Sequence, residues 1–516
     1  MANAGLFKSL SGKLLAKAGA RNHEGAAAYA LTPQAALAQY AMTGCLNHTF
    51  YSTADMQLAK VLDMAQDVDD EFLAKLAVYS RRQGFMKDMP ALLLALLAQR
   101  QSALLAPAFA AVVDNGRMLR NFVQIVRSGA TGRKSLGTRP KKLVQQWLNT
   151  ATPQQLLNAA IGNDPSLADV VKMVHPQPAE PWRAAFFGWL LGKPFELDAL
   201  PENIRAFEFY KRGVSQELPD VPFLMLTSLP LQTEEWTRLA QGMSWQSLRM
   251  NLNTLSRHGV FADPAVVARL AARLGDAATV HKAKAFPYQL MTSWTAAKDL
   301  PRPLADALQD ALEASLRNVP ELTGRVVVCP DVSGSMQSPA TGFRPGATSS
   351  VRCIDVAALV SAALLRRNPQ TRVMPFEVDV VALGLNARDT VMTNAQKLAG
   401  IGGGGTNCSA PLARLNREKA AVDLVVFVSD NESWVDNRRH GATQMMHEWA
   451  EIRKRNPQAR LVCIDVQPHE TTQAADVEDI LNIGGFSDEV FRLLGLFARN
   501  EMAAGHWETV IRQVEL

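Results

Sequence analysis

Apolar residues recur at helical spacing between residues 28 and 320 of this chain. Side chains three and four positions apart lie on one face of a helix, so this spacing predicts amphipathic helices. Proline or glycine separates one apolar segment from the next, and both residue types interrupt helices. The predicted helices cover residues 54–83, 90–100, 141–150, 181–191, 234–256 and 264–274. Many short helices without strands between them favour helix pairs stacked as a solenoid, although no repeat of fixed length is visible.

The pattern changes near residue 324, where short apolar runs begin to alternate with amphipathic segments. The predicted strands cover residues 325–330, 372–383, 422–429 and 460–466, and the predicted helices cover residues 351–367, 411–419, 440–455 and 488–498. Such alternation is typical of a doubly wound α/β sheet. We therefore predict an N-terminal extension (1–24), an all-α domain (25–320) and an α/β domain (321–516), with the main boundary near Pro320.

Length and composition indicate a folded, multidomain protein. The chain has 516 residues, which is longer than the size at which one core usually stops growing. It has no run of about 18 uncharged apolar residues, so we expect no membrane span. The first 24 residues carry Lys8, Lys13 and Lys17 but no convincing cleavage site, which favours an ordinary amphipathic segment over a targeting signal.

The cysteines indicate a reducing environment. None of the five has CxxC spacing, and three lie on or beside predicted strands. This distribution favours reduced, mostly buried thiols in a cytoplasmic protein over disulfides or a zinc site. The cysteines are Cys45, Cys329, Cys353, Cys408 and Cys463.

Positive charge is concentrated in the helical part. The net charge is +5, but residues 1–320 carry 34 basic and 26 acidic side chains, whereas residues 321–516 carry 20 and 23. Between residues 117 and 142 eight basic side chains meet no acidic one, and a break at residues 135–140 suggests a loop that presents them. Such a cluster indicates contact with a polyanion, although a solvated helical face is the alternative. The basic residues are Arg117, Arg120, Arg127, Arg133, Lys134, Arg139, Lys141 and Lys142.

Oxygen ligands follow two predicted strands of the α/β domain. Asp331, Ser333 and Ser335 come directly after the first strand, and Asp430 ends the strand over 422–429. Thr406 follows the glycine run 402–405. Because the carboxyl ends of parallel strands meet at one edge, we expect these oxygens to converge on a divalent cation, most simply Mg²⁺. The alternative is a turn at Ser333–Ser335 and a helix cap at Asp430.

This set of residues resembles the metal-ion-dependent adhesion site of von Willebrand factor A domains. The resemblance implies that Ser333, Ser335 and Thr406 bind the ion directly, while Asp331 and Asp430 bind through water or complete the shell. One position would stay open for a carboxylate or phosphate oxygen of a partner.

The whole chain, over roughly residues 25–510, resembles the Ro autoantigen family of TROVE-domain proteins. The α/β domain carries DVSGSM, GGGGTNCSAP, FVSDNESW and IGGFSDEVFRLL. The helical part carries KDMPALLLALL at 87–97, RPKKLVQQWLN at 139–149, SLADVVKMVHPQP at 166–178 and KAFPYQL at 284–290. Leu167 and Asn407 depart from the animal pattern, in which a second histidine and an acidic residue are expected.

The resemblance implies a ring of HEAT-like helical repeats closed by the A domain, most simply a monomeric one. It implies small noncoding Y-like RNA on the basic outer surface and single-stranded 3′ ends of misfolded or structured RNA in the central hole. Bacterial relatives imply work with polynucleotide phosphorylase or RNA-repair enzymes. The RNA-binding positions carried over are Lys134, Arg139, Lys141, Lys142 and His175.

Enzymatic motifs are absent from the sequence. The glycine run lacks the Lys-Ser/Thr of a P-loop, the serines of DVSGSM are not in GxSxG, and His440, His447 and His469 lack HExxH spacing. We therefore expect a noncatalytic RNA-binding scaffold for RNA quality control, processing or degradation. A metal-dependent module that binds an acidic residue of a partner protein is the main alternative, and an undetected RNA-processing enzyme is a third.

Overall fold

The computed structural model describes residues 15–44, 46–49, 51–283, 285, 287–296, 299–343, 351–433, 442–487, 489–502 and 506–516. Cys45, His440 and the first part of the predicted N-terminal extension, with Lys8 and Lys13, lie outside these residues.

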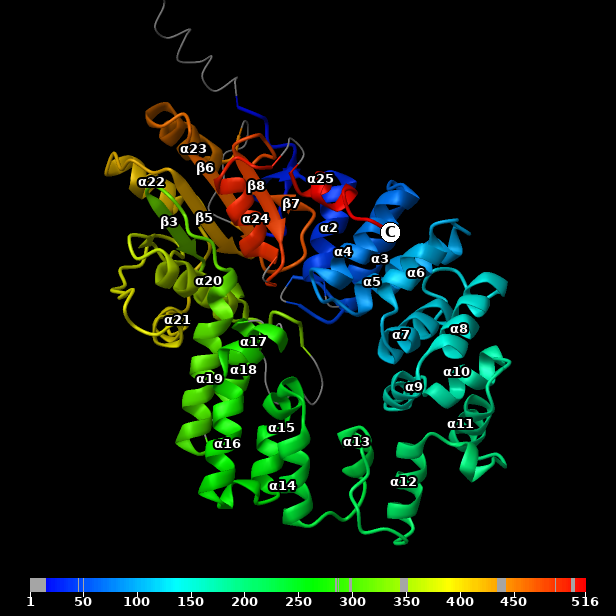
Figure 1. Ribbon diagram of the computed structural model, residues 1–516. Helices are drawn as coiled ribbons and strands as arrows, with labels where there is room; N and C mark the ends of the chain where they lie inside the picture. Colours follow the sequence, from blue (N-terminus) through cyan, green and yellow to red (C-terminus); the bar gives the residue numbers. More distant parts are fainter. Residues whose placement is uncertain are drawn as a thin grey trace, which may run out of the picture.

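Short helices make up the first part of the chain after an N-terminal hairpin. They follow one another in a wide arc that leaves the α/β domain and returns to it (Figure 1). They are α2 (Pro33–Thr43), α3 (Ala54–Gln66), α4 (Asp70–Arg82), α5 (Asp88–Gln99), α6 (Leu105–Val112), α7 (Gly116–Arg127), α8 (Thr138–Thr150), α9 (Pro153–Ala159), α10 (Leu167–Val174), α11 (Pro181–Leu191), α12 (Glu202–Lys211), α13 (Phe223–Leu226), α14 (Thr233–Gly242), α15 (Trp245–Arg257), α16 (Pro264–Gly275), α17 (Ala277–Ala283), α18 (Pro287–Ala296) and α19 (Arg302–Ser315).

Capping side chains divide two segments that were predicted as single helices. Residues 54–83 form α3 and α4, because the Asp69 carboxylate accepts a hydrogen bond from the backbone N–H of Phe72 and starts a new helix. Residues 234–256 fall within α14 and α15, where Ser244 caps the second helix in the same way. A side-chain oxygen at the N-cap satisfies a backbone donor that the first turn leaves unpaired.

The C-terminal part is a parallel sheet with helices on both faces. Its five strands have the order β4-β3-β5-β6-β8. The strands are β3 (Val326–Pro330), β4 (Arg372–Val373), β5 (Leu424–Ser429), β6 (Arg460–Asp465) and β8 (Ile480–Gly484). The helices are α20 (Cys353–Arg367), α21 (Val391–Ala399), α22 (Ala410–Arg417), α23 (Gln444–Arg455), α24 (Glu489–Ala498) and α25 (His506–Arg512).

Alternate strand residues point into two separate cores. Val328 and Val426 face α20 and α24 and belong to the same apolar cluster as the helical arc. Cys329 and Phe427 face α22 and α23 in a second cluster. Of the strand predicted over 372–383, only the part up to Phe376 runs beside β3. Arg372 and Val373 form β4, Met374 and Phe376 donate backbone hydrogen bonds to β3, and the chain then turns back on itself between Phe376 and Val380.

Both ends of the helical arc rest on the α/β domain. At the start, the hairpin of β1 (Ala20–Arg21) and β2 (Ala27–Ala30) pairs with β7 (Thr471–Thr472), and α2 packs on β8. At the end, α18 and α19 pack on α20 and α21. The prediction of a helical-repeat ring closed by a doubly wound domain is therefore confirmed (Figure 1). The domain boundaries at residues 24 and 320 stay predictions, and no described helix is long and apolar enough to cross a membrane.

Candidate metal centre and nucleic-acid interface

The predicted metal ligands lie at the carboxyl end of the sheet. Asp331 follows β3 and Asp430 follows β5, and the two strands are paired in register, with Pro330 opposite Val428. All five predicted ligands are buried: Asp331, Ser333, Ser335, Thr406 and Asp430. The open α/β sheet thus gathers at one edge residues that are up to 99 positions apart in the chain.

Hydrogen bonds fix the first of these ligands. One carboxylate oxygen of Asp331 accepts a hydrogen bond from the Ser333 backbone N–H at 2.9 Å, and the other accepts from the Ser429 hydroxyl at 2.5 Å. The hydroxyls of Ser333 and Ser335 are 3.3 Å apart. Ser429 was not predicted as part of the site, because its side chain reaches Asp331 only through the pairing of the two strands.

The glycine run that precedes Thr406 contacts the segment that carries Ser333 and Ser335. The backbone N–H of Gly334 donates to the Gly404 carbonyl at 3.2 Å. Gly404 has a φ of +70°, and a Cβ there would lie 2.1 Å from a carboxylate oxygen of Glu377. Glycine is therefore favoured at position 404 by its conformation, and a larger residue would also displace the Glu377 side chain.

The electrostatics of this edge fit a cation. Burial, together with the nearby charge of Asp430, raises the pKa of Asp331 to about 7. Burial also raises the pKa of Asp430. The Oδ2 atom of Asp430 is buried and has no hydrogen-bond partner among the described residues. Hydroxyl and carboxylate oxygens around an unsatisfied oxygen fit a hard ion such as Mg²⁺.

The basic residues surround a pocket on the helical ring. A loop of residues 128–137 joins α7 to α8, and a cavity of about 560 Å³ lies between this loop, α8 and the end of α10. Four basic side chains line it: Arg127, Lys134, Lys141 and Lys142. None of these four makes an ion pair with an acidic side chain of the described residues.

The other predicted basic residues do not line the pocket. Arg133 and Arg139 donate to the carbonyls of Ala98 and Gln101, so they hold the loop and α8 against the end of α5. Arg117 is exposed on the first turn of α7.

Arg120 does not belong to this surface. It is buried, and its guanidinium donates to the carbonyl of Ala159. A helix presents alternate faces to solvent and core, and Arg120 lies on the core side of α7, so it supports packing rather than contact with a phosphate.

His175 lies beside the pocket. It ends α10 in a left-handed conformation, with a φ of 53°, and is exposed. The side-chain amide of Gln145, which lines the pocket, donates to the Val174 carbonyl at 2.6 Å. This bond joins the end of α10 to α8, so His175 and the lysines of α8 belong to neighbouring parts of one surface.

Fold and sites together define a helical ring closed by an A-type domain with an oxygen-ligand centre. A family model described as the Ro60 vWA domain matches residues 325–498. The RNA-binding protein RO60 of Deinococcus radiodurans is 26% identical over 522 residues, which cover 93% of this chain and 96% of that protein. The crystal structure of the Deinococcus radiodurans RO (RSR) protein shares the fold, with a TM-score of 0.60 at 20% identity over 91% of this chain and 100% of that chain.

Residues 325–498 thus match the Ro60 type of A domain, and the chain as a whole is similar to a bacterial Ro protein in sequence and to Rsr in fold, as its motifs predicted. The relative is named for RNA binding and not for a reaction, which agrees with the prediction of a noncatalytic protein.

Proposed function

We propose that this protein is a noncatalytic RNA-binding ring. It binds small noncoding Y-like RNA on its basic outer surface and admits single-stranded ends of misfolded or structured RNA to its central hole. It thereby scaffolds RNA quality control, processing or degradation. The observation that carries the proposal is the pocket lined by Arg127, Lys134, Lys141 and Lys142, whose charges have no acidic partner among the described residues.

Unpaired cationic side chains around a concave surface favour a phosphate backbone. Each lysine or arginine that neutralises a phosphate releases condensed counterions, and this release drives binding. Arg133 and Arg139 are bonded to backbone carbonyls and keep the loop in place. The three lysines then act as flexible point charges, which suit a backbone whose sequence varies.

Cellular partners follow from the same proposal. The ring works as a monomer in the cytoplasm and presents its RNA to polynucleotide phosphorylase or to RNA-repair enzymes. The resemblance to the bacterial Ro proteins supports this part.

The salt dependence of RNA binding tests the proposal. The affinity of the full chain for a structured RNA with a single-stranded 3′ end is measured by filter binding at several salt concentrations. Replacing Lys134, Lys141 and Lys142 by alanine is expected to reduce the magnitude of the log–log slope by about 2 to 3, since each phosphate contact contributes about 0.7–0.9.

A matched variant controls for the loss of net charge. Lys193, Arg269 and Lys419 are exposed and lie away from the pocket, and their replacement by alanine removes the same three charges. This control is expected to leave the slope nearly unchanged. Equal slopes for the wild type and the pocket variant would contradict the proposed RNA surface.

A second function is supported by the metal centre. The partnerless Oδ2 of Asp430 favours a bound cation, which Ser333, Ser335 and Thr406 would hold directly and Asp331 and Asp430 through water. Such an ion would supply a positive charge that binds an acidic residue of a partner protein.

Metal binding and RNA binding can be separated. Mg²⁺ binding measured by isothermal titration calorimetry is expected to be lost in Thr406→Ala, while RNA affinity stays within about twofold of the wild type. If Thr406→Ala weakens RNA binding as strongly as the lysine variant does, the centre serves RNA and the docking function is wrong.

A further inference from the structure

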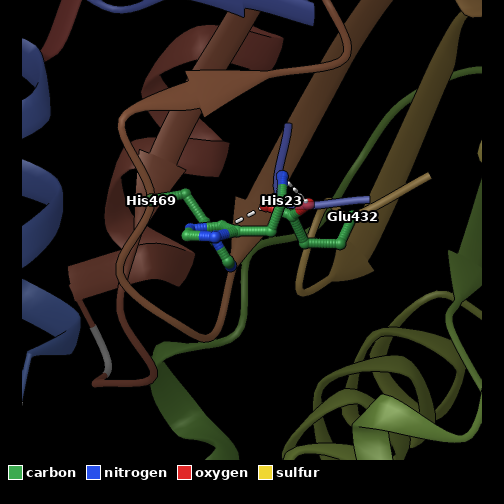
Figure 2. Close-up of side chains that lie close together, drawn as sticks. All are labelled: His23, Glu432 and His469. Atoms are coloured by element: carbon green, nitrogen blue, oxygen red, sulfur yellow. Dashed lines mark hydrogen bonds and ion pairs between the residues drawn. The ribbon is translucent and has the colours of Figure 1, made fainter. Parts of the chain in front are cut away.

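A second cluster of metal-type ligands lies beside the oxygen centre. His23 lies in the turn between β1 and β2, Glu432 follows β5, and His469 precedes β7. Figure 2 shows the three side chains directed toward one another. One ligand atom from each residue lies within 4.8 Å of those of the other two. The cluster therefore joins the N-terminal hairpin to two loops of the α/β domain.

The two buried residues of the cluster have polar atoms without hydrogen-bond partners. Glu432 and His469 are each 1% exposed. One oxygen of Glu432 accepts the backbone N–H of His23 at 2.8 Å, and the other lies 2.9 Å from Nδ1 of His469. The Nε2 atom of His469 is buried and has no hydrogen-bond partner among the described residues. Nδ1 of His469 and the Glu432 oxygen that it faces also have no hydrogen-bond partner among the described residues, although they lie close together. Buried polar atoms normally have a partner, so these unsatisfied ligand atoms point to a missing ion.

We propose that His23, Glu432 and His469 bind a divalent transition-metal ion, with Zn²⁺ as the best fit. Two imidazoles and one carboxylate form a borderline-soft ligand set that suits zinc, whereas Mg²⁺ prefers oxygen ligands alone. Ligand atoms of a tetrahedral zinc site lie about 3.4 Å apart when the bonds are about 2.0–2.1 Å. The observed spacing, within 4.8 Å, is close to that value, and the 2.9 Å between Glu432 and Nδ1 of His469 is already below it.

An ion in this cluster would connect the N-terminal hairpin to the α/β domain. His23 is exposed, so an ion can reach the site from solvent. The hairpin is also held without metal, because the side-chain amide of Asn22 donates to the Ser433 carbonyl at 2.6 Å. The ion would therefore reinforce an existing contact between the first strands of the chain and the A domain, which closes the ring.

Zinc binding by the untagged full chain tests the proposal. Isothermal titration calorimetry with Zn²⁺ is expected to show one site in the wild type. His23→Ala and His469→Ala are each expected to weaken it by about tenfold or more. Because His23 is exposed and its backbone bond to Glu432 survives truncation, His23→Ala keeps the test valid even if His469→Ala fails to fold.

Two controls locate the ion. His175→Ala removes an exposed imidazole elsewhere, and Thr406→Ala removes a ligand of the oxygen centre, so both should keep the zinc affinity of the wild type. Co²⁺ is expected to give d–d absorption without a thiolate charge-transfer band, because the four described cysteines are buried and outside the cluster.

Thermal unfolding supplies a second measurement. Zn²⁺ is expected to raise the Tm of the wild type and not that of His23→Ala, since a ligand stabilises only the state that binds it. Equal zinc affinities for the wild type, His23→Ala and His469→Ala would overturn the proposal. A thiolate charge-transfer band with Co²⁺ would also overturn it.

Discussion

At the scale of single residues, the carboxyl end of the sheet holds several buried carboxyl groups. Asp465 ends β6 and is completely surrounded by protein. Its Oδ2 atom accepts a hydrogen bond from Gln39 of α2 at 2.9 Å. Burial raises the pKa of Asp465 to about 8, because the charged carboxylate loses its contact with water. The folded protein therefore holds a proton on Asp465 at neutral pH.

We predict that this proton makes stability fall as pH rises. Between about pH 4 and pH 8 the folded state keeps the proton and the unfolded state loses it, so each pH unit lowers the free energy of unfolding by up to about 1.4 kcal/mol. Asp465→Asn removes this dependence. Thermal unfolding is expected to show a larger gain in Tm for the variant at pH 8 than at pH 5.5.

Asp423 provides a control, because its pKa is shifted in the opposite direction to that of Asp465. Its bond with Arg325 lowers the pKa of Asp423 to about 2, so its contribution is constant above about pH 4 and is lost only in acid. Asp423→Asn should therefore give a Tm curve parallel to that of the wild type between pH 5.5 and pH 8. A parallel curve for Asp465→Asn as well would contradict the first prediction.

At the scale of elements, the close approach of two helices supports the basic surface. Gly116 begins α7, and a Cβ at this position would lie 2.1 Å from the Cβ of Ala159 at the end of α9. The same contact is bridged by Arg120, which donates to the Ala159 carbonyl. Because α7 leads into the loop that carries Lys134, the spacing of α7 and α9 positions that loop.

We predict that Gly116→Ala destabilises this part of the ring. The added methyl group must push α7 away from α9, and overpacking of this kind costs about 1–3 kcal/mol. Gly242→Ala is a matched control at the end of α14, because no atom lies within 4 Å of the added Cβ. Urea unfolding should show a lower free energy of unfolding only for Gly116→Ala. Equal midpoints for the two variants would contradict the proposed role of the contact between α7 and α9.

At the scale of the whole molecule, the ring is closed by segments from opposite ends of the chain. The C-terminal helix α25 packs on α4 and α2. The indole N–H of Trp507 donates to the Tyr79 hydroxyl at 3.2 Å, and that hydroxyl donates to Glu489 at 2.7 Å. Trp507 is buried, so this junction combines apolar packing with a chain of hydrogen bonds.

We predict that Trp507→Ala loosens the closed ring. Loss of a buried tryptophan costs about 3–5 kcal/mol, which is large for a single junction. Limited proteolysis is expected to release the C-terminal helix faster, and small-angle scattering to show a larger radius of gyration. Arg512→Ala in the same helix removes a half-exposed ion pair with Asp69 and a cation–π contact with Phe72 but keeps Trp507 buried, so it should change both measurements much less. Similar proteolysis of the wild type and Trp507→Ala would contradict this junction's role.

Much of the fold could be predicted from local patterns, and the exceptions have local causes. The strand at 325–330 and the helix at 181–191 agree closely with β3 and α11, because each is a continuous apolar segment between clear breakers. The fifth strand, β8, was not predicted. It contains the polar residue Asn482, whose side chain bonds to Thr472 and Ala474 only in the folded state.

The sequence alone determined which oxygen ligands meet at the edge of the sheet. Asp331, Thr406 and Asp430 follow strand or loop signals that can be read locally, and parallel topology brings such ends together. Tertiary structure alone decided that His23 meets His469 and that Arg120 is buried while Lys134 is exposed. Those outcomes depend on how distant elements pack, and residue spacing along the chain carries no information about contacts made after the ring closes.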